Sequence, residues 1–195
     1  MDTEWKLNPD ILAQALDMIG INTEVDMFAS RINAQLLWYV SFRPDPTSEA
    51  VDSFSNSWFG FLFYAFPPLC VILSMLQKIR RDKARGVVVL PDWPNQPWYA
   101  AVARMFVKRP VLVSARNNLL CLPQLPEEKH RLVKLRLIIC GISGVDSESQ
   151  DFRTQLFQLC APHGALGLRR NTPHTYKDGE GTLTEGILIQ FHRCK

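Results

Sequence analysis

The sequence predicts an α/β protein with a doubly wound, mostly parallel sheet, and three observations support this fold class. Short apolar runs alternate with helical patterns along the first 125 residues. The clearest strand is residues 87–90, where β-branched residues are bounded by Gly86 and Pro91, as in a buried parallel strand. The long apolar stretch 58–76 is interrupted centrally by Pro67 and Pro68, which favours a strand followed by a helix.

A helix is predicted near the amino end, over residues 9–19. Asn8 is a suitable N-cap, Pro9 suits the first turn, and Gly20 is a typical helix terminator. Apolar residues recur at helical spacing and make one face: Ile11, Leu12, Ala15, Leu16 and Ile19. We therefore expect this helix to bury that face against the sheet.

The following elements are predicted from the same patterns. Residues 23–28 are a strand, 29–37 a short helix capped by Ser30, and 37–41 a second strand. After a proline-containing loop, the expected elements are strand 61–65, helix 69–85, strand 87–90, helix 98–107 and strand 110–114. This alternation implies right-handed crossovers between parallel strands.

Beyond residue 125 the composition changes. Residues 134–140 are one more apolar element, and residues 186–191 read as a terminal strand. Residues 141–185 are rich in glycine, serine, threonine and charged side chains, which predicts a linker or weakly ordered tail. We therefore divide the chain into an α/β domain over residues 1–125 and a polar, partly linker-like C-terminal extension over residues 126–195.

Charge is unevenly distributed along the chain. Residues 1–52 carry 3 basic and 9 acidic side chains, whereas the remainder carries 19 basic and 10 acidic ones. A basic cluster that could contact the phosphates of DNA or RNA consists of Arg80, Arg81, Lys83 and Arg85. The alternative interpretation is the solvated face of a helix end.

Cysteine usage indicates an intracellular protein of the cytoplasm or nucleus. The five cysteines are odd in number and widely spaced, and the sequence does not begin with a secretory segment, so free thiols in a reducing compartment are expected. A zinc site can be drawn from Cys160, His163, His174, His192 and Cys194. Paired Cys-x-x-Cys motifs are missing, so we predict no metal.

A membrane helix is the main alternative for residues 58–76, because about 20 apolar residues span a bilayer. Pro67 and Pro68 lie in the middle of that stretch, and the neighbouring strands need part of it to complete a sheet. We therefore expect no membrane partner.

A cofactor site is expected where a strand ends and the next connection begins, because ligands of open α/β sheets bind at the carboxyl ends of strands. The first candidates are Asp26, Phe28, Ala29 and Ser30. Neither a glycine-rich dinucleotide fingerprint nor a P-loop is present. The alternative for Asp26 is an ordinary solvated carboxylate.

Several segments in order resemble phage-type Dam adenine methyltransferases over about residues 23–115. They are Val25-Asp26-Met27-Phe28-Ala29-Ser30, Asp52, Phe63-Tyr64-Ala65-Phe66-Pro67-Pro68 and the strand ending at Pro91. The resemblance implies a methyltransferase (Rossmann-like) sheet and S-adenosylmethionine as cofactor. It assigns cofactor binding to Asp26, Phe28, Ala29, Ser30 and Asp52.

The chain is also similar to the Dam-like region at the C-terminal end of DIRS-type (tyrosine recombinase) retrotransposon polyproteins, downstream of reverse transcriptase and RNase H. The similar segments are residues 25–33, Arg43-Pro44-Asp45-Pro46, Ala65-Phe66-Pro67-Pro68 and Trp93-Pro94-Asn95-Gln96-Pro97-Trp98. The resemblance implies a polyprotein fragment or a domesticated remnant, with the neighbouring polyprotein domains as partners.

The catalytic loop of these methyltransferases is Asn/Asp-Pro-Pro-Tyr, and this chain has Phe66-Pro67-Pro68-Leu69 there. Phe66 has no hydrogen-bond acceptor for the exocyclic amine of adenine, and Leu69 cannot stack on a flipped base. The resemblance therefore implies a degenerate, inactive domain that retains the fold. Two alternatives stay open: an active S-adenosylmethionine-dependent DNA adenine methyltransferase, and a protein-interaction module that exposes Trp93, Trp98 and Tyr99.

Overall fold

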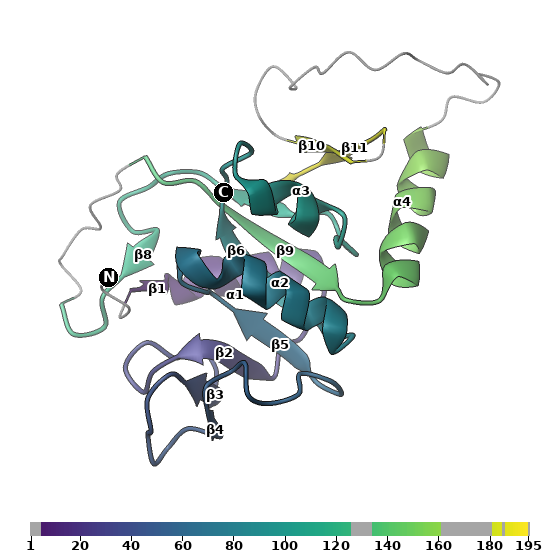
Figure 1. Cartoon of the computed structure of the whole chain (residues 1–195). Coiled ribbons are helices and arrows are strands. Elements are labelled where there is room, and N and C mark those ends of the chain that lie inside the picture. The colour runs from purple at the N-terminus through teal and green to yellow at the C-terminus, as the bar shows by residue number, and fades with distance from the viewer. Residues whose placement is uncertain (1–4, 126–133, 161–180, 185, 195) are drawn as a thin grey trace.

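The computed structural model describes residues 5–125, 134–160, 181–184 and 186–194, and its centre is a mixed eight-stranded sheet (Figure 1). The strand order is β12-β7-β9-β6-β5-β2-β3-β4. The strands are β2 (Val25–Ala29), β3 (Trp38–Ser41), β4 (Ala50–Val51), β5 (Leu62–Ala65), β6 (Arg85–Pro91), β7 (Val111–Val113), β9 (Leu137–Ser143) and β12 (His192–Cys194). All are parallel except β9, which is antiparallel to both β6 and β7. The predicted α/β class with a mostly parallel sheet is therefore confirmed.

Helices cover both faces of this sheet. On one face, α1 (Pro9–Ile19) packs against the apolar side chains of β6, β7 and β9. On the other face lie α2 (Ile72–Arg81), which follows the 3₁₀ turn η1 (Leu69–Val71), α3 (Pro97–Ala103) and α4 (Asp146–Cys160). Figure 1 shows α2 and α3 together over the middle of the sheet and α4 beside it.

Two antiparallel ribbons lie outside the main sheet. β1 (Lys6–Leu7) pairs with β8 (Leu120–Cys121), which joins the amino end of the chain to the segment after β7. β10 (Gly181–Thr184) pairs with β11 (Ile187–Gln190), and this hairpin contacts α3 and α4. The predicted terminal strand, residues 186–191, is therefore present as β11, and the edge strand β12 (His192–Cys194) follows it as a separate strand.

The predicted first helix is confirmed, including its two ends. The Asn8 side chain accepts a hydrogen bond from the Asp10 backbone N–H at 2.9 Å, and Pro9 occupies the first turn. Gly20 ends the helix with a φ of 70°, where its N–H donates to the Leu16 carbonyl. A side chain is rarely tolerated at such a φ, which explains why glycine stands there.

The predicted short helix over residues 29–37 is wrong, because the connection between β2 and β3 consists of turns. Residues 30–37 must lead back along a strand of five residues, a distance of about 16 Å. Eight residues of α-helix would extend only about 12 Å. The connection is therefore too short to be helical, and Ser30 begins a turn in which its carbonyl accepts from the N–H groups of Asn33 and Ala34.

Two predicted helices end earlier in the structure. The helix expected to reach residue 85 ends at Arg81, because Lys83 has a φ of 50° and β6 starts at Arg85. Asp82 lies at this end and accepts from the buried Lys78 ammonium at 2.7 Å and from the Trp58 backbone N–H at 3.0 Å. Similarly, α3 ends at Ala103 rather than at residue 107.

The predicted linker over residues 141–185 is wrong for its first part. Residues 141–143 belong to the buried strand β9, and residues 146–160 form α4. The small residues there meet a packing requirement: a Cβ on Gly144 would lie 2.0 Å from the Ile79 carbonyl oxygen. Glycine thus marks close contact rather than flexibility. Residues 161–180 lie outside the described residues, and residues 181–184 of the predicted linker form the strand β10.

The structure tests the predictions for the apolar stretch 58–76 and for the aromatic residues Trp98 and Tyr99 separately. Residues 58–76 form β5, η1 and the start of α2 on either side of the Pro-Pro corner, as predicted. No helix within the described residues has the length and apolar character needed to cross a membrane. Trp98 and Tyr99 are buried in the core, so these two do not form the exposed aromatic patch of an interaction module.

Candidate functional site

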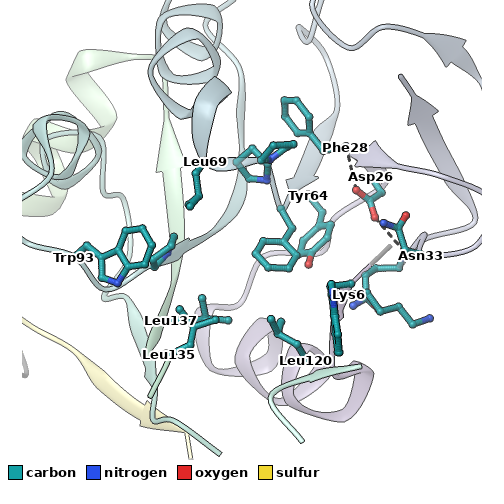
Figure 2. A pocket seen from close by; sticks show the side chains of 16 residues that line it. Lys6, Asp26, Phe28, Asn33, Tyr64, Leu69, Trp93, Leu120, Leu135 and Leu137 are labelled. Atoms are coloured by element: carbon teal, nitrogen blue, oxygen red, sulfur yellow. Dashed lines mark hydrogen bonds between the residues drawn. The ribbon is translucent and has the colours of Figure 1, made fainter. Parts of the chain in front are cut away.

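A cavity of about 160 Å³ opens at the carboxyl edge of the sheet, where β2, β5 and β6 end (Figure 2). Its location agrees with the general rule for ligand sites in open α/β sheets. The walls are mostly apolar, with five aromatic side chains from four segments of the chain: Trp5, Phe28, Tyr64, Phe66 and Trp93. The polar side chains that line it are Lys6, Asp26, Asn33, Gln35 and Tyr64.

Asp26 is the buried carboxyl group of this cavity, with 2% of its surface exposed. One of its oxygens accepts from the Phe28 backbone N–H at 3.3 Å and the other from the Gln35 N–H at 3.1 Å. Burial raises the pKa of Asp26 to about 7, although these two hydrogen bonds and the charge of Lys6 act to lower it. In the part of the chain that the structure describes, Asp26 has no ion-pair partner within 4.0 Å.

The turns after β2 hold this wall of the cavity in place. The Asn33 side-chain oxygen accepts from the Ser30 backbone N–H at 2.7 Å and from the Ser30 hydroxyl at 3.1 Å. Gln35 donates its backbone N–H to Asp26 and its side-chain amide to the Leu7 carbonyl on β1. The connection that replaces the expected helix therefore links the buried carboxyl to the β1–β8 ribbon.

Tyr64 lies next to Asp26, because the two residues are register partners on the adjacent parallel strands β2 and β5. Only 1% of Tyr64 is exposed, and its hydroxyl has no hydrogen-bond partner among the described residues. Burial, together with the nearby charge of Asp26, raises the pKa of Tyr64 well above its usual value. Its hydroxyl therefore keeps its proton and remains a hydrogen-bond donor.

The Pro-Pro loop forms the next part of the wall. Phe66, Pro67, Pro68 and Leu69 follow β5 directly, and all four line the cavity. Phe66 and Leu69 are partly buried and pack against opposite sides of the core. Their side chains are hydrocarbon, so this loop offers no side-chain hydrogen bond to a molecule in the cavity.

The predicted cofactor residues are only partly brought together. Asp26 and Phe28 line the cavity, whereas Ala29, Ser30 and Asp52 are not among its lining residues. Asp52 follows β4 at the edge of the sheet, with a φ of 58°. Its carboxylate accepts from the Phe54 N–H at 3.0 Å and from the Ser55 hydroxyl at 2.8 Å, so it stabilises a local turn.

The basic cluster lies far from the cavity. Arg80, Arg81, Lys83 and Arg85 are all exposed, at the end of α2 and the beginning of β6. β6 runs from Arg85 to Pro91, which lines the cavity, and seven strand residues span about 20 Å. The cluster and the cavity are therefore at opposite edges of the sheet.

Several cavity residues were not predicted from the sequence. Trp5 and Lys6 come from the amino end, and Leu120, Leu135 and Leu137 come from β8 and the segment around the start of β9. The β1–β8 ribbon brings the amino end beside Leu120, more than a hundred residues later in the chain. The reversed direction of β9 places Leu137 beside Pro91. No local pattern in the sequence encodes either feature.

The sequence also contained a possible set of zinc ligands. No group of three or more metal-binding side chains occurs within the described residues. His163, His174 and the side chain of Cys160 lie outside them.

The raised pKa of Asp26 predicts a specific dependence of stability on pH. Because the folded-state pKa lies above the unfolded value, the contribution to stability is full below pH 4 and is lost as the pH rises through about 7. Between pH 5 and pH 8 the unfolding free energy should fall by roughly 2–3 kcal/mol relative to Asp26→Asn. Urea unfolding of both proteins at several pH values measures this difference.

The matched control is Asp151→Asn, which removes an exposed carboxylate on α4. This variant should follow the wild-type pH profile throughout. If Asp26→Asn also follows that profile, the buried carboxyl ionises in the folded protein as readily as in solvent, and its raised pKa is refuted.

Comparisons with known proteins assign no family to this chain. No protein-family model matches it, and neither a curated protein nor a solved structure does. Any function therefore has to follow from the cavity, its neighbouring residues and the topology of the sheet.

Proposed function

We propose that this chain is a degenerate Dam-like methyltransferase domain, derived from a retrotransposon polyprotein, that has lost methyl transfer and keeps a ligand site at its sheet edge. The observation that carries the proposal is the position of Phe66-Pro67-Pro68-Leu69. This loop follows a central parallel strand and lines a cavity together with Asp26 of the neighbouring strand. In the methyltransferases that the sequence resembles, the loop of the same form lies between cofactor and substrate.

The topology of the sheet supports the proposal. Five parallel strands, from β4 to β6, are followed by the reversed strand β9 and then by β7. The resemblance implies a doubly wound, mostly parallel sheet, and a mostly parallel sheet with helices on both faces fits that expectation. Fold alone does not establish activity, so the side chains around the loop decide what chemistry remains.

The side chains of the loop argue against catalysis. Methylation of an exocyclic amine requires an acceptor that orients the amine as its lone pair attacks the methyl group. Phe66 has no acceptor, and burying the amine against it without a partner costs about 1–3 kcal/mol in addition to the lost contact. Leu69 also lacks the ring that stacks on a flipped base. Asp26 is the cavity carboxylate that remains available for a cofactor amine.

The cofactor site is tested by calorimetric titration of the full chain with S-adenosylmethionine and with its demethylated product. If the cofactor part of the site is retained, binding in the micromolar range is expected, equivalent to about −8 kcal/mol. Asp26→Asn should weaken binding at least tenfold, because it removes the carboxylate that faces the cavity. A folded protein that binds neither compound would exclude S-adenosylmethionine as its ligand.

The lost chemistry is tested by restoring it. Phe66→Asn combined with Leu69→Tyr supplies an acceptor and a stacking ring at the two degenerate positions. We expect no methyl transfer to adenine in DNA by the wild type and weak transfer by the double variant, measured with radiolabelled cofactor. Wild-type activity would instead support an active methyltransferase, and an inactive double variant that binds cofactor would show that other groups are missing.

Nucleic-acid binding is proposed for the basic cluster at the opposite edge. Arg80→Gln combined with Lys83→Gln should weaken binding of a duplex oligonucleotide and reduce the slope of log affinity against log salt by about 2, since each phosphate contact contributes about 1. Fluorescence anisotropy between 50 and 200 mM salt, about the range over which such contacts are lost, measures both effects.

The control for this experiment is Arg31→Gln with Arg43→Gln, which removes two exposed positive charges on the other side of the molecule. This variant should keep the wild-type slope. Equal losses in the two double variants would mean that net charge, and not the cluster, attracts the nucleic acid.

A further inference from the structure

We propose that the cavity binds a free small molecule with a single planar ring that carries a hydrogen-bond acceptor next to a donor. In this site the Tyr64 hydroxyl donates to the acceptor, and the Asp26 carboxyl accepts from the donor. The inference does not require that S-adenosylmethionine binds, because it follows from the size, lining and polar groups of the cavity itself.

The volume of the cavity, which is partly open to solvent, indicates what fits within its walls. A cavity of about 150 Å³ lined by apolar side chains is large enough for benzene. The present cavity, at about 160 Å³, is therefore suited to one six-membered ring with a small substituent. A complete nucleoside cofactor is larger and would have to extend beyond these walls.

The lining favours a flat and largely apolar ligand. Figure 2 shows Trp93 and Leu69 on one side of the cavity and the polar groups of Asp26, Asn33 and Lys6 on the other. Aromatic side chains bind other rings in offset-stacked or edge-to-face arrangements, which Trp93 and Phe66 can provide. A ring between these two sides would have apolar contact on one edge and hydrogen-bonding groups on the other.

The unpartnered hydroxyl of Tyr64 is the observation that points to a polar group on the ligand. Nearly all buried polar atoms in folded proteins are hydrogen-bonded to protein, water or a ligand. The Tyr64 hydroxyl has no partner among the described residues, and Tyr64 lines the cavity. The hydroxyl atom itself is buried, so we expect its partner to be a ligand atom that reaches it from the cavity as the neighbouring side chains move apart.

Asp26 supplies the second half of the recognition. Each of its oxygens accepts one backbone N–H, and a carboxylate has room for about four hydrogen bonds in total. Asp26 and Tyr64 are direct neighbours on β2 and β5, so both can reach adjacent atoms of one ring substituent. A carboxamide or a lactam carries an acceptor and a donor at such adjacent positions.

The charge around the cavity favours a free molecule over a base within a nucleic acid. Of the described residues that line the cavity, Lys6 alone is basic, and the basic cluster lies at the opposite edge of the sheet. Contacts to phosphates dominate the affinity of proteins for nucleic acids. A single lysine among the described lining residues provides few such contacts.

The test uses three probes of equal ring size on the full chain: benzamide, with both acceptor and donor; acetophenone, with the acceptor only; and toluene, with neither. Binding is followed by NMR titration. We expect benzamide to bind at least tenfold more tightly than toluene. Tyr64→Phe should weaken benzamide and acetophenone about tenfold, whereas Asp26→Asn should weaken benzamide alone.

The control variant is Tyr39→Phe, because Tyr39 is also buried but donates or accepts its hydrogen bond at Thr47, away from the cavity. It should bind all three probes like the wild type. Thermal unfolding checks that Tyr64→Phe, which removes one oxygen atom only, remains folded.

Failure of benzamide to bind the wild type, equal binding of benzamide and toluene, or unchanged benzamide binding by Tyr64→Phe would each overturn the inference. Equal binding of benzamide and toluene, or unchanged binding by Tyr64→Phe, would mean that the Tyr64 hydroxyl is hydrogen-bonded to water or to nothing. Benzamide binding without S-adenosylmethionine binding would exclude that cofactor as the ligand and leave this inference intact. Binding of S-adenosylmethionine without binding of benzamide would overturn this inference alone.

Discussion

The structure depends on the pairing of β6 with β9. All seven residues of β9 are buried, and seven register pairs join it to β6 in antiparallel direction. This ladder connects the five parallel strands on one side with β7 and β12 on the other. It also brings Leu137, at the start of β9, beside Pro91, at the end of β6. The reversal of a single strand therefore supplies one wall of the cavity.

The Pro-Pro corner after β5 is the second constraint. Pro68 cannot donate a hydrogen bond and has a ψ of 144°, so the chain leaves the strand in an extended form before η1 begins. Phe66 and Leu69 then diverge toward the two parts of the core and leave space between them and Asp26. The same prolines that prevent a long apolar helix thus create the edge at which a ligand can bind.

The cavity combines apolar walls with two polar groups that are costly to bury. Tyr64 has no hydrogen-bond partner among the described residues, and Asp26 has only backbone partners there. A hydrocarbon side chain of similar shape would stabilise the fold more than either polar group does. Buried polar groups of this kind are therefore typical of functional sites. Phe66 and Leu69 beside them are hydrocarbon side chains, so the polar groups of this part of the cavity come from the strands and not from the Pro-Pro loop.

Much of the fold could be predicted because it depends on interactions between residues that are close in sequence. The caps at Asn8 and Gly20, the β-branched run before Pro91 and the break at Pro67 each act within a few residues, so their elements followed from sequence. Asp26, in contrast, was expected at the end of a strand and is the buried second residue of β2. Register and packing act over long distances, and they decided the rest.

Only tertiary structure made Asp26 buried, placed Tyr64 beside it, and added Lys6 from the amino end to the same cavity. It also turned the glycine-rich segment around Gly144 into close-packed core, because a glycine that permits contact and a glycine that permits flexibility are identical in sequence. The eight residues after β2 had a helical pattern, but the distance that they must span excluded a helix.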